Sequence, residues 1–227
     1  MPVGYSAEGG RAMSINIAVL ASGRGSNLEA ILEAIAQGKL DAVVKLVLVN
    51  VPGAGALDIA TKYGVATAVI PNAGMTRKEH EEKVIAELKK HELDFIVLAG
   101  YMRVLSSHLL SNFKDSRGFF KVINIHPSLL PAFPGVRGYE EAFEYGVKVA
   151  GVTVHLVDEK VDHGPILAQA AFDRQPDDTL ESFKARGLKI EHEIYPQVLQ
   201  AIAKGGVSFF QRHAASDVTA DRETARR

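Results

Sequence analysis

The sequence predicts an α/β protein with a doubly wound, mostly parallel sheet and antiparallel additions in its C-terminal half. Through the first hundred residues, short apolar runs alternate with segments whose apolar residues recur at helical spacing. This alternation is typical of parallel strands joined by right-handed helical crossovers. After Asn124 the pattern becomes irregular, and an acidic loop separates two strand-like runs at 151–157 and 165–171. Such a short connection favours antiparallel pairing.

A local pattern supports each predicted element. The first strand is the apolar run 15–21, and a glycine-containing turn then leads to Leu28, Ile31, Leu32 and Ile35 at helical spacing. Strands are predicted at 15–21, 43–49, 66–70, 95–99 and in a run that ends at His126, and helices at 28–37, 56–63, 77–91 and 179–204. The helix at 77–91 is rich in charge and is expected to be exposed. The last helix carries apolar residues along one face and closes the fold.

Length and composition indicate a compact enzyme. The 227 residues, 47% hydrophobic and 23% charged, can build a sizeable core in a single domain over 15–211. We expect a flexible leader at 1–14 and a disordered polar tail at 212–227. The net charge of -1 gives no support for a nucleic-acid or membrane partner. The N-terminus lacks the apolar core of a signal peptide, which predicts a cytoplasmic protein.

Asn124 and His126 are the first candidates for catalysis. They lie two residues apart at the end of an apolar strand, and side chains at i and i+2 share a face. An amide donor and an imidazole acid could therefore converge on one reacting oxygen. Asp162, in the acidic loop, could fix the tautomer of the imidazole and stabilise its protonated form. The alternative is that Asn124 and His126 only satisfy backbone groups at the start of a Pro-rich loop, and that Asp162 belongs to a structural turn.

Residues 22–27 (SGRGSN) form a second candidate site, at the carboxyl end of the first strand. Two glycines, polar side chains and the positive end of a helix dipole make this turn suitable for a phosphate. The third glycine of a dinucleotide fingerprint is missing and no Gly-Lys-Ser/Thr follows, so one phosphate on a small substrate fits best. The alternative is a tight turn capped by Ser26 or Asn27.

Five motifs together resemble the phosphoribosylglycinamide formyltransferase family, the folate-dependent transformylases of purine synthesis. They are 22–28 (SGRGSNL), 98–103 (LAGYMR), 124–131 (NIHPSLLP), 161–165 (VDHGP) and 191–196 (EHEIYP). The resemblance covers about 15–210 and implies a Rossmann-like formyltransferase fold. Its N-terminal half would bind the ribotide phosphate, and its C-terminal half would carry the catalytic and folate-binding residues.

The resemblance also implies the reaction and the residues that serve it. The formyl group of the co-substrate 10-formyltetrahydrofolate would pass to the amino group of glycinamide ribonucleotide, with no metal. Asn124, His126 and Asp162 match the family's catalytic trio, and Glu191 matches a position that binds the glycinamide end. The residues matching the substrate-phosphate loop are Gly23, Arg24, Gly25, Ser26 and Asn27. Those matching the folate pocket are Met102, Arg103, Val104, Leu105, Asp158, Glu159 and Val161. Arg77, at the head of the charged helix, could meet the folate glutamate tail, and the alternative is a solvated arginine.

Some assignments have alternatives. Glu191 could be a solvated helix residue, His155 a satisfied core histidine, and His163 an exposed turn residue. His80 is expected on a polar surface, and the histidines show no paired spacing for a metal. Arg137 stands where many family members carry a histidine, so any supporting role of that histidine is lost or replaced.

Other functions on the same residues also stay open. Formyltetrahydrofolate hydrolase and methionyl-tRNA formyltransferase use the same trio, but each commonly needs a further domain. A module that binds ribotide or folate without turnover is the non-enzymatic alternative, although binding alone would not require the trio. The partners we expect are the two small-molecule substrates, in a monomer or a homodimer. The absence of cysteine excludes disulfides, thiolate metal ligands and cysteine nucleophiles.

Overall fold

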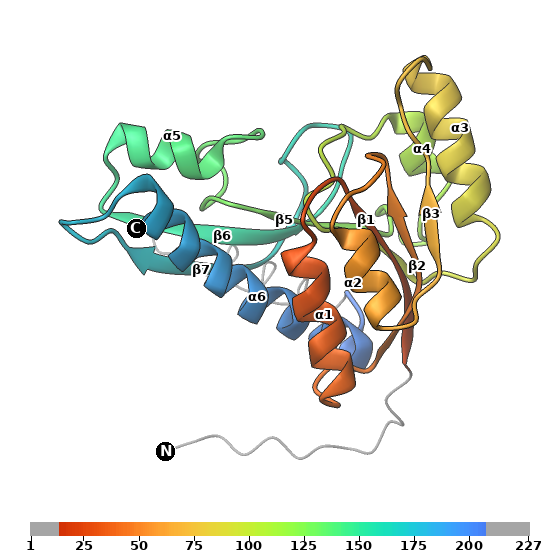
Figure 1. Cartoon of the computed structure of the whole chain (residues 1–227), viewed down its shortest axis with the longest axis horizontal. Coiled ribbons are helices and arrows are strands. Elements are labelled where there is room, and N and C mark those ends of the chain that lie inside the picture. The colour runs from red at the N-terminus through yellow and green to blue at the C-terminus, as the bar shows by residue number, and fades with distance from the viewer. Residues whose placement is uncertain (1–13, 208–227) are drawn as a thin grey trace, which may run out of the picture.

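The computed structural model describes residues 14–207, and its centre is a seven-stranded sheet with the order β3-β2-β1-β4-β5-β6-β7 (Figure 1). The strands are β1 (Ile15–Ala21), β2 (Ala42–Val49), β3 (Thr67–Val69), β4 (Phe95–Leu98), β5 (Val122–His126), β6 (Val149–Leu156) and β7 (Ile166–Asp173). The helices are α1 (Ser26–Ala36), α2 (Ala56–Lys62), α3 (Arg77–Leu88), α4 (Ser107–Ser111), α5 (Gly138–Tyr145) and α6 (Leu180–Gly205). The predicted tail, and the predicted leader except Ser14, lie outside the described residues.

The predicted fold class is confirmed by the pairing of the strands. Strands β1 to β5 pair in parallel, whereas β5 with β6 and β6 with β7 pair in antiparallel. Two short helices, α4 and α5, were not predicted, because each is too short to show a clear helical periodicity. Within residues 14–207, no helix is both long and apolar enough to cross a membrane.

Two cores, one on each face of the sheet, explain why the central strands are apolar throughout. Ile17 and Val19 of β1 face the core that contains α1, α2 and α6, whereas Ala18 and Leu20 face the core that contains α3 and α4. Successive strand residues point to opposite faces, so a strand buried on both sides is apolar throughout. Tyr195 of α6 is fully buried and its hydroxyl lies 3.0 Å from the Leu98 carbonyl oxygen, which fixes this helix beneath β4.

The helix α3 differs in one respect from the exposed helix that was predicted. Its N-terminus is closed by a capping box between Thr76 and Glu79, as its charged first turn favours. One face of the helix is nevertheless buried, and it includes His80, whose Nε2 lies 3.0 Å from the Ile70 carbonyl oxygen. The prediction that His80 lies on a polar surface is therefore wrong, because the charges around it mask a narrow buried stripe.

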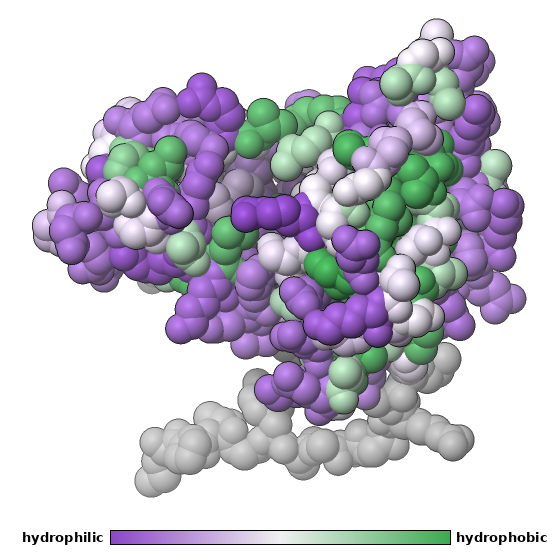
Figure 2. All heavy atoms as spheres, in the orientation of Figure 1, coloured by the Kyte–Doolittle hydropathy of each residue, from purple (hydrophilic) through white to green (hydrophobic). Residues whose placement is uncertain are grey.

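The carboxyl ends of the parallel strands open into a depression. The space-filling view shows the surface hollowed between the lobe that contains α5 and the part that contains α1 and α2 (Figure 2). Open parallel sheets bind ligands at this edge, where the loops after the strands converge. The fold thus brings the turn after β1, the segment after β4 and the end of β5 into one place.

Candidate active site

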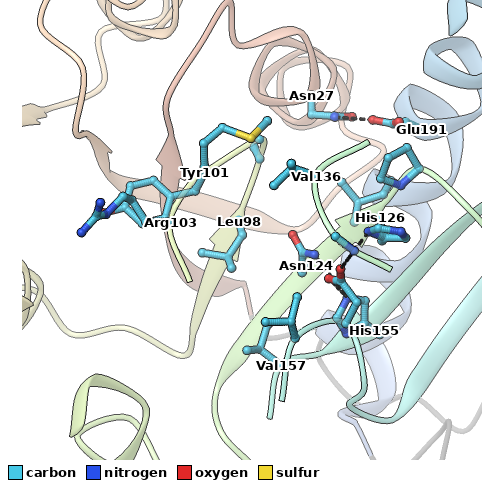
Figure 3. Close-up of a pocket in the computed structure, with 18 of the residues that line it drawn as sticks. Asn27, Leu98, Tyr101, Arg103, Asn124, His126, Val136, His155, Val157 and Glu191 are labelled. Atoms are coloured by element: carbon cyan, nitrogen blue, oxygen red, sulfur yellow. Dashed lines mark hydrogen bonds and ion pairs between the residues drawn. The ribbon is translucent and has the colours of Figure 1, made fainter. Parts of the chain in front are cut away.

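A cavity of about 470 Å³ lies at the carboxyl edge of the sheet (Figure 3). Its walls come from the turn after β1, the segment after β4, the end of β5, the start of α5, the loop after β6 and the first half of α6. Sixteen of the predicted site residues line it: Gly23, Arg24, Gly25, Ser26, Asn27, Met102, Arg103, Val104, Leu105, Asn124, His126, Asp158, Glu159, Val161, Asp162 and Glu191. Segments distant in the sequence therefore share one wall, and Arg77 is the predicted residue that does not line it.

Asn124 is held by a buried histidine of the neighbouring strand. The antiparallel register of β5 and β6 pairs Asn124 with His155, and their Nδ2 and Nε2 atoms lie 3.2 Å apart. Nδ1 of His155 lies 2.9 Å from the carbonyl oxygen of Leu156 and must donate to it, so Nε2 of a neutral ring accepts from Asn124. Burial lowers the pKa of His155, which keeps the ring neutral. The second N–H of the Asn124 amide stays available for a substrate oxygen.

His126 is buried and in contact with acceptors at both ring nitrogens. Nε2 lies 2.8 Å from the Phe133 carbonyl oxygen, and Nδ1 lies 3.4 Å from Oδ2 of Asp162. An imidazolium can donate at both nitrogens, so these surroundings suit the protonated ring. The same Asp162 oxygen accepts a hydrogen bond of 2.7 Å from the Gly135 N–H. Asp162 has a φ of +50°, a left-handed conformation that Asp adopts more readily than most residues.

The turn after β1 has the geometry of an anion site. Gly25 is the N-cap of α1 with a φ of +85°, and no side chain caps the helix. The alternative of a cap from Ser26 or Asn27 is therefore wrong, and the first N–H groups of α1 have neither intrahelical nor side-chain partners. A Cβ atom on Gly25 would lie 2.8 Å from Cα of Ala56, so glycine alone permits this close packing against α2.

Glu191 lies in the same half of the cavity and is buried, so the alternative of a solvated helix glutamate is wrong. Oε2 accepts a hydrogen bond of 2.6 Å from Nδ2 of Asn27, and Oε1 accepts one of 2.6 Å from the Tyr139 hydroxyl. Burial raises the pKa of Glu191, and both hydrogen bonds oppose that rise. A desolvated carboxylate in a fixed orientation can select a ligand by its hydrogen-bond donors.

The other half of the cavity is apolar at its mouth. Met102, Val104 and Val161 are 63%, 56% and 51% exposed, a high exposure for large apolar side chains. Large apolar side chains left in contact with water around a cavity often mark a binding site. Arg77 lies behind this wall, where its Nη2 donates to the Val104 carbonyl oxygen at 2.8 Å and its Nε contacts Glu81 at 3.3 Å.

The comparison with known proteins identifies the family. The formyl transferase family matches residues 15–199. The chain belongs to the formyl transferase family. The phosphoribosylglycinamide formyltransferase of Bacillus subtilis is 42% identical, over 82% of this chain and 93% of that protein. The enzyme of the same name from Escherichia coli is 36% identical, over 89% and 94%. A crystal structure of the enzyme from Bacillus halodurans superposes with a TM-score of 0.79 at 37% identity, over 86% and 98% of the two chains.

Two residues that contact the candidate site were not predicted to belong to it. His155 was expected to be a satisfied core histidine, which it is, but it also orients Asn124. Tyr139 was not singled out for any role, because its contact with Glu191 joins residues 52 positions apart. The alternating pattern around His155 predicted a strand, but its place opposite Asn124 depends on the register between β5 and β6.

Arg137 and His163 lie on the surface of this formyl transferase. Arg137 donates to Glu144 at 2.9 Å and does not line the cavity, so it does not replace a histidine there. His163 is an exposed turn residue, as predicted, and its Nδ1 lies 2.7 Å from Oδ2 of Asp158. Over residues 14–207, no three His, Asp or Glu side chains gather closely enough to hold a metal ion.

Proposed function

We propose that the protein transfers the formyl group of 10-formyltetrahydrofolate to the amino group of glycinamide ribonucleotide. One observation carries the proposal: Asn124, His126 and Asp162 line the same cavity as a turn suited to phosphate and a wall with exposed apolar side chains. The family of the chain and the names of its relatives favour the same reaction. The formyl carbon would thus meet the amine where the two halves of the cavity join.

In the proposed mechanism, the substrate amine attacks the formyl carbon directly. A bond forms between the amine nitrogen and the formyl carbon, and the electron pair of the carbonyl moves to its oxygen. The free N–H of Asn124 and an N–H of the protonated His126 stabilise that oxyanion. For this step the ring of His126 exchanges its contact with the Phe133 carbonyl oxygen for one with the substrate.

Asp162 serves the second half of the reaction. Its carboxylate stabilises the imidazolium of His126 and accepts the proton that the attacking nitrogen loses, directly or through water. The carbonyl re-forms, the bond between the formyl carbon and the folate nitrogen breaks, and the proton passes to that nitrogen. The products are formylglycinamide ribonucleotide and tetrahydrofolate, and no covalent enzyme intermediate is required.

The two substrates would occupy opposite halves of the cavity. We assign the ribotide phosphate to the backbone N–H groups of Gly25, Ser26 and Asn27, beside Gly23 and Arg24, and the glycinamide end to Glu191. We assign the folate to the remaining predicted residues that line the other half: Met102, Arg103, Val104, Leu105, Asp158, Glu159 and Val161. Arg77 would support this half through the Val104 carbonyl, and contact with the folate glutamate tail remains a prediction.

The wider organisation is proposed on the same basis. A single domain over 15–211 would contain both substrate sites, because all the lining residues belong to one sheet, its helices and the loops that connect them. The reaction uses two small soluble metabolites, which is compatible with the cytoplasm and with a monomer or a homodimer.

A spectrophotometric assay with 10-formyltetrahydrofolate, with and without glycinamide ribonucleotide, tests the proposal. The wild type should turn over only with the ribotide. Asp162→Asn should lower kcat by a factor of about 10² to 10⁴, the range for a residue that transfers protons. Asp58→Asn changes an exposed carboxylate on α2 in the same way and should be fully active. Turnover without ribotide would indicate a hydrolase, and binding without turnover would indicate a module.

A further inference from the structure

Tyr139 makes a buried contact for which the proposed chemistry has no use. Its ring is 6% exposed, and its hydroxyl donates to Oε1 of Glu191 at 2.6 Å. Burial and the charge of Glu191 raise the pKa of Tyr139 far above its ordinary range, so the hydroxyl keeps its proton and acts as a donor. Tyr139 lies on α5 and Glu191 on α6, so this hydrogen bond joins two helices at the wall of the cavity.

Gly187 makes the contact possible. A Cβ atom at Gly187 would lie 2.4 Å from both Cε1 and the hydroxyl oxygen of Tyr139. Any other residue would therefore push the ring away from the helix. Glycine is among the poorest helix formers, yet it stands inside the 26-residue helix α6, one turn before Glu191. The helix thus has a recess for the ring beside the carboxylate that the ring reaches.

The first turn of α5 is held by contacts on two sides. Tyr139 packs edge-on against Phe183 of α6, with the ring centroids 6.3 Å apart, and Glu140 forms an ion pair with Lys184. On the other side, a Cβ atom at Gly138 would lie 3.3 Å from Nε2 of His126. The first turn of α5 therefore packs closely beside His126 at Gly138 and reaches Glu191 through Tyr139.

We propose that Tyr139 is a positioning residue for Glu191 and thereby determines how tightly the ribotide binds. The Tyr139 hydroxyl holds one carboxylate oxygen and Asn27 holds the other, which leaves one orientation in which Glu191 can accept hydrogen bonds from the substrate. This inference rests on the proposed function, since it names the substrate that Glu191 receives. It extends that function to a residue of the cavity wall that has no part in the proposed proton and formyl transfers.

The pH dependence of ribotide binding should reflect the hydrogen bond between Tyr139 and Glu191. The groups that face Glu191 are Tyr139 from α5, Asn27 from α1 and Tyr195 from the next turn of α6, and Lys184 nearby is paired with Glu140. Burial raises the pKa of Glu191, and the two hydrogen bonds lower it. Removing the Tyr139 hydroxyl should therefore raise this pKa further, and less of the carboxylate would be ionised at a given pH below neutrality.

The experiment compares Tyr139→Phe with Tyr145→Phe. Tyr145 lies on the same helix, is 80% exposed and lies outside the cavity, so its hydroxyl should be dispensable. In Tyr139→Phe, KM for glycinamide ribonucleotide should rise about 10-fold, the order expected for one hydrogen bond to a charged group. The acid limb of kcat/KM should move to higher pH, whereas KM for 10-formyltetrahydrofolate should stay the same. A change in both KM values together, or in neither, would overturn the proposal.

A second measurement does not depend on turnover. The carboxyl pKa of Glu191, followed by NMR with ¹³C-labelled glutamate, should be higher in Tyr139→Phe than in the wild type. An unchanged pKa would overturn the positioning role even if the enzyme were active, and a wild type without ribotide-dependent turnover would overturn only the proposed function. Gly187→Ala, which displaces the ring, should raise KM for the ribotide as Tyr139→Phe does, and should add little to it in the double variant.

Discussion

Nδ2 of Asn124 donates a hydrogen bond to Nε2 of His155, which lies 3.2 Å away on the neighbouring strand. The other ring nitrogen fixes the direction of this bond. Nδ1 of His155 must donate to the Leu156 carbonyl oxygen, so Nε2 of the neutral ring can only accept. The Asn124 amide therefore cannot turn over without losing its partner. A chain of two hydrogen bonds thus decides which end of the Asn124 amide would meet the formyl oxygen in the proposed reaction.

Two variants of His155 separate orientation from packing. Asparagine can offer a donor near the position of Nδ1 but has no acceptor near Nε2, whereas glutamine can offer an acceptor there. We expect His155→Asn to lower kcat about 10- to 100-fold, because an oxyanion donor that loses its orientation loses part of its effect. His155→Gln should retain more activity, and KM for both substrates should change little. Steady-state kinetics of both variants measure the effect. Equal decreases of kcat in the two variants would contradict a role of His155 in orienting Asn124.

His155 should also make the fold sensitive to acid. Burial is the main reason that its pKa lies below the ordinary value of 6.5, and the unfolded chain has no such burial. As the pH falls below 6.5, His155 binds a proton in the unfolded chain but stays neutral in the folded protein. Stability should therefore be complete above that pH and should decrease below it, by up to about 1.4 kcal/mol per pH unit for this group.

Urea unfolding at about pH 7.5 and at about pH 5.5 measures this effect, with pH values chosen on both sides of an unperturbed histidine pKa. The difference in unfolding free energy between wild type and His155→Gln isolates His155 from other titrating groups, such as Glu191. The stability of the variant relative to wild type should improve as the pH falls. A difference that stays constant with pH would mean that His155 is not held neutral by burial.

Local patterns predicted much of this structure. Asn124 and His126 share a strand face, and the turn after β1 follows a glycine pattern, so each arrangement is encoded within a few residues. The predicted strand 15–21 has the same bounds as β1. The parallel sheet followed from the alternation of strands and helices. The antiparallel additions followed from the two strand-like runs at 151–157 and 165–171, which correspond to β6 and β7.

Contacts between distant segments could not be predicted in the same way. The partner of Asn124 depends on the register between β5 and β6, and the partner of Glu191 depends on how α5 packs on α6. Helix α5 itself was missed, because it begins with a glycine after a Pro-rich segment and has only eight residues. Its stability comes from packing on α6 rather than from its own sequence.

Gly25→Ala tests the packing of the phosphate turn. An alanine would have to adopt a φ of +85° and would bring Cβ to 2.8 Å from Cα of Ala56. The left-handed backbone alone costs about 1–3 kcal/mol, and relief of the contact would shift the first turn of α1. We expect a lower Tm and a rise in KM for the ribotide of more than about 10-fold, equivalent to about 1.4 kcal/mol.

Gly38→Ala is the matched control for the cost of placing alanine at a positive φ. Gly38 also has a positive φ, of +67°, but no atom lies within 4 Å of a Cβ built there, and the residue lies outside the cavity. It should lower Tm without changing KM for either substrate. If both alanine variants changed KM alike, the effect would come from lost stability rather than from the turn.

Glu81 should fix the folate half of the cavity without touching the folate. It is 5% exposed, Oε1 accepts from the Ser106 N–H at 2.9 Å, and Oε2 accepts from the Ser106 hydroxyl. Ser106 ends the segment whose residues 101–105 line the cavity, and Arg77 ties Glu81 to the Val104 carbonyl. In Glu81→Gln one oxygen becomes a donor, so one of the Ser106 groups loses its acceptor, at a cost of about 1–3 kcal/mol.

Glu81→Gln should change KM for only one of the two substrates. KM for 10-formyltetrahydrofolate should rise on the order of 10-fold, because the wall at 102–105 is less well held, while KM for the ribotide should not change. Glu82→Gln alters the adjacent glutamate, which is half exposed and contacts His108, and should leave both KM values as they are. Since the two halves of the cavity are built on different helices, a rise in both KM values for Glu81→Gln would show that the wall does not act independently of the phosphate turn.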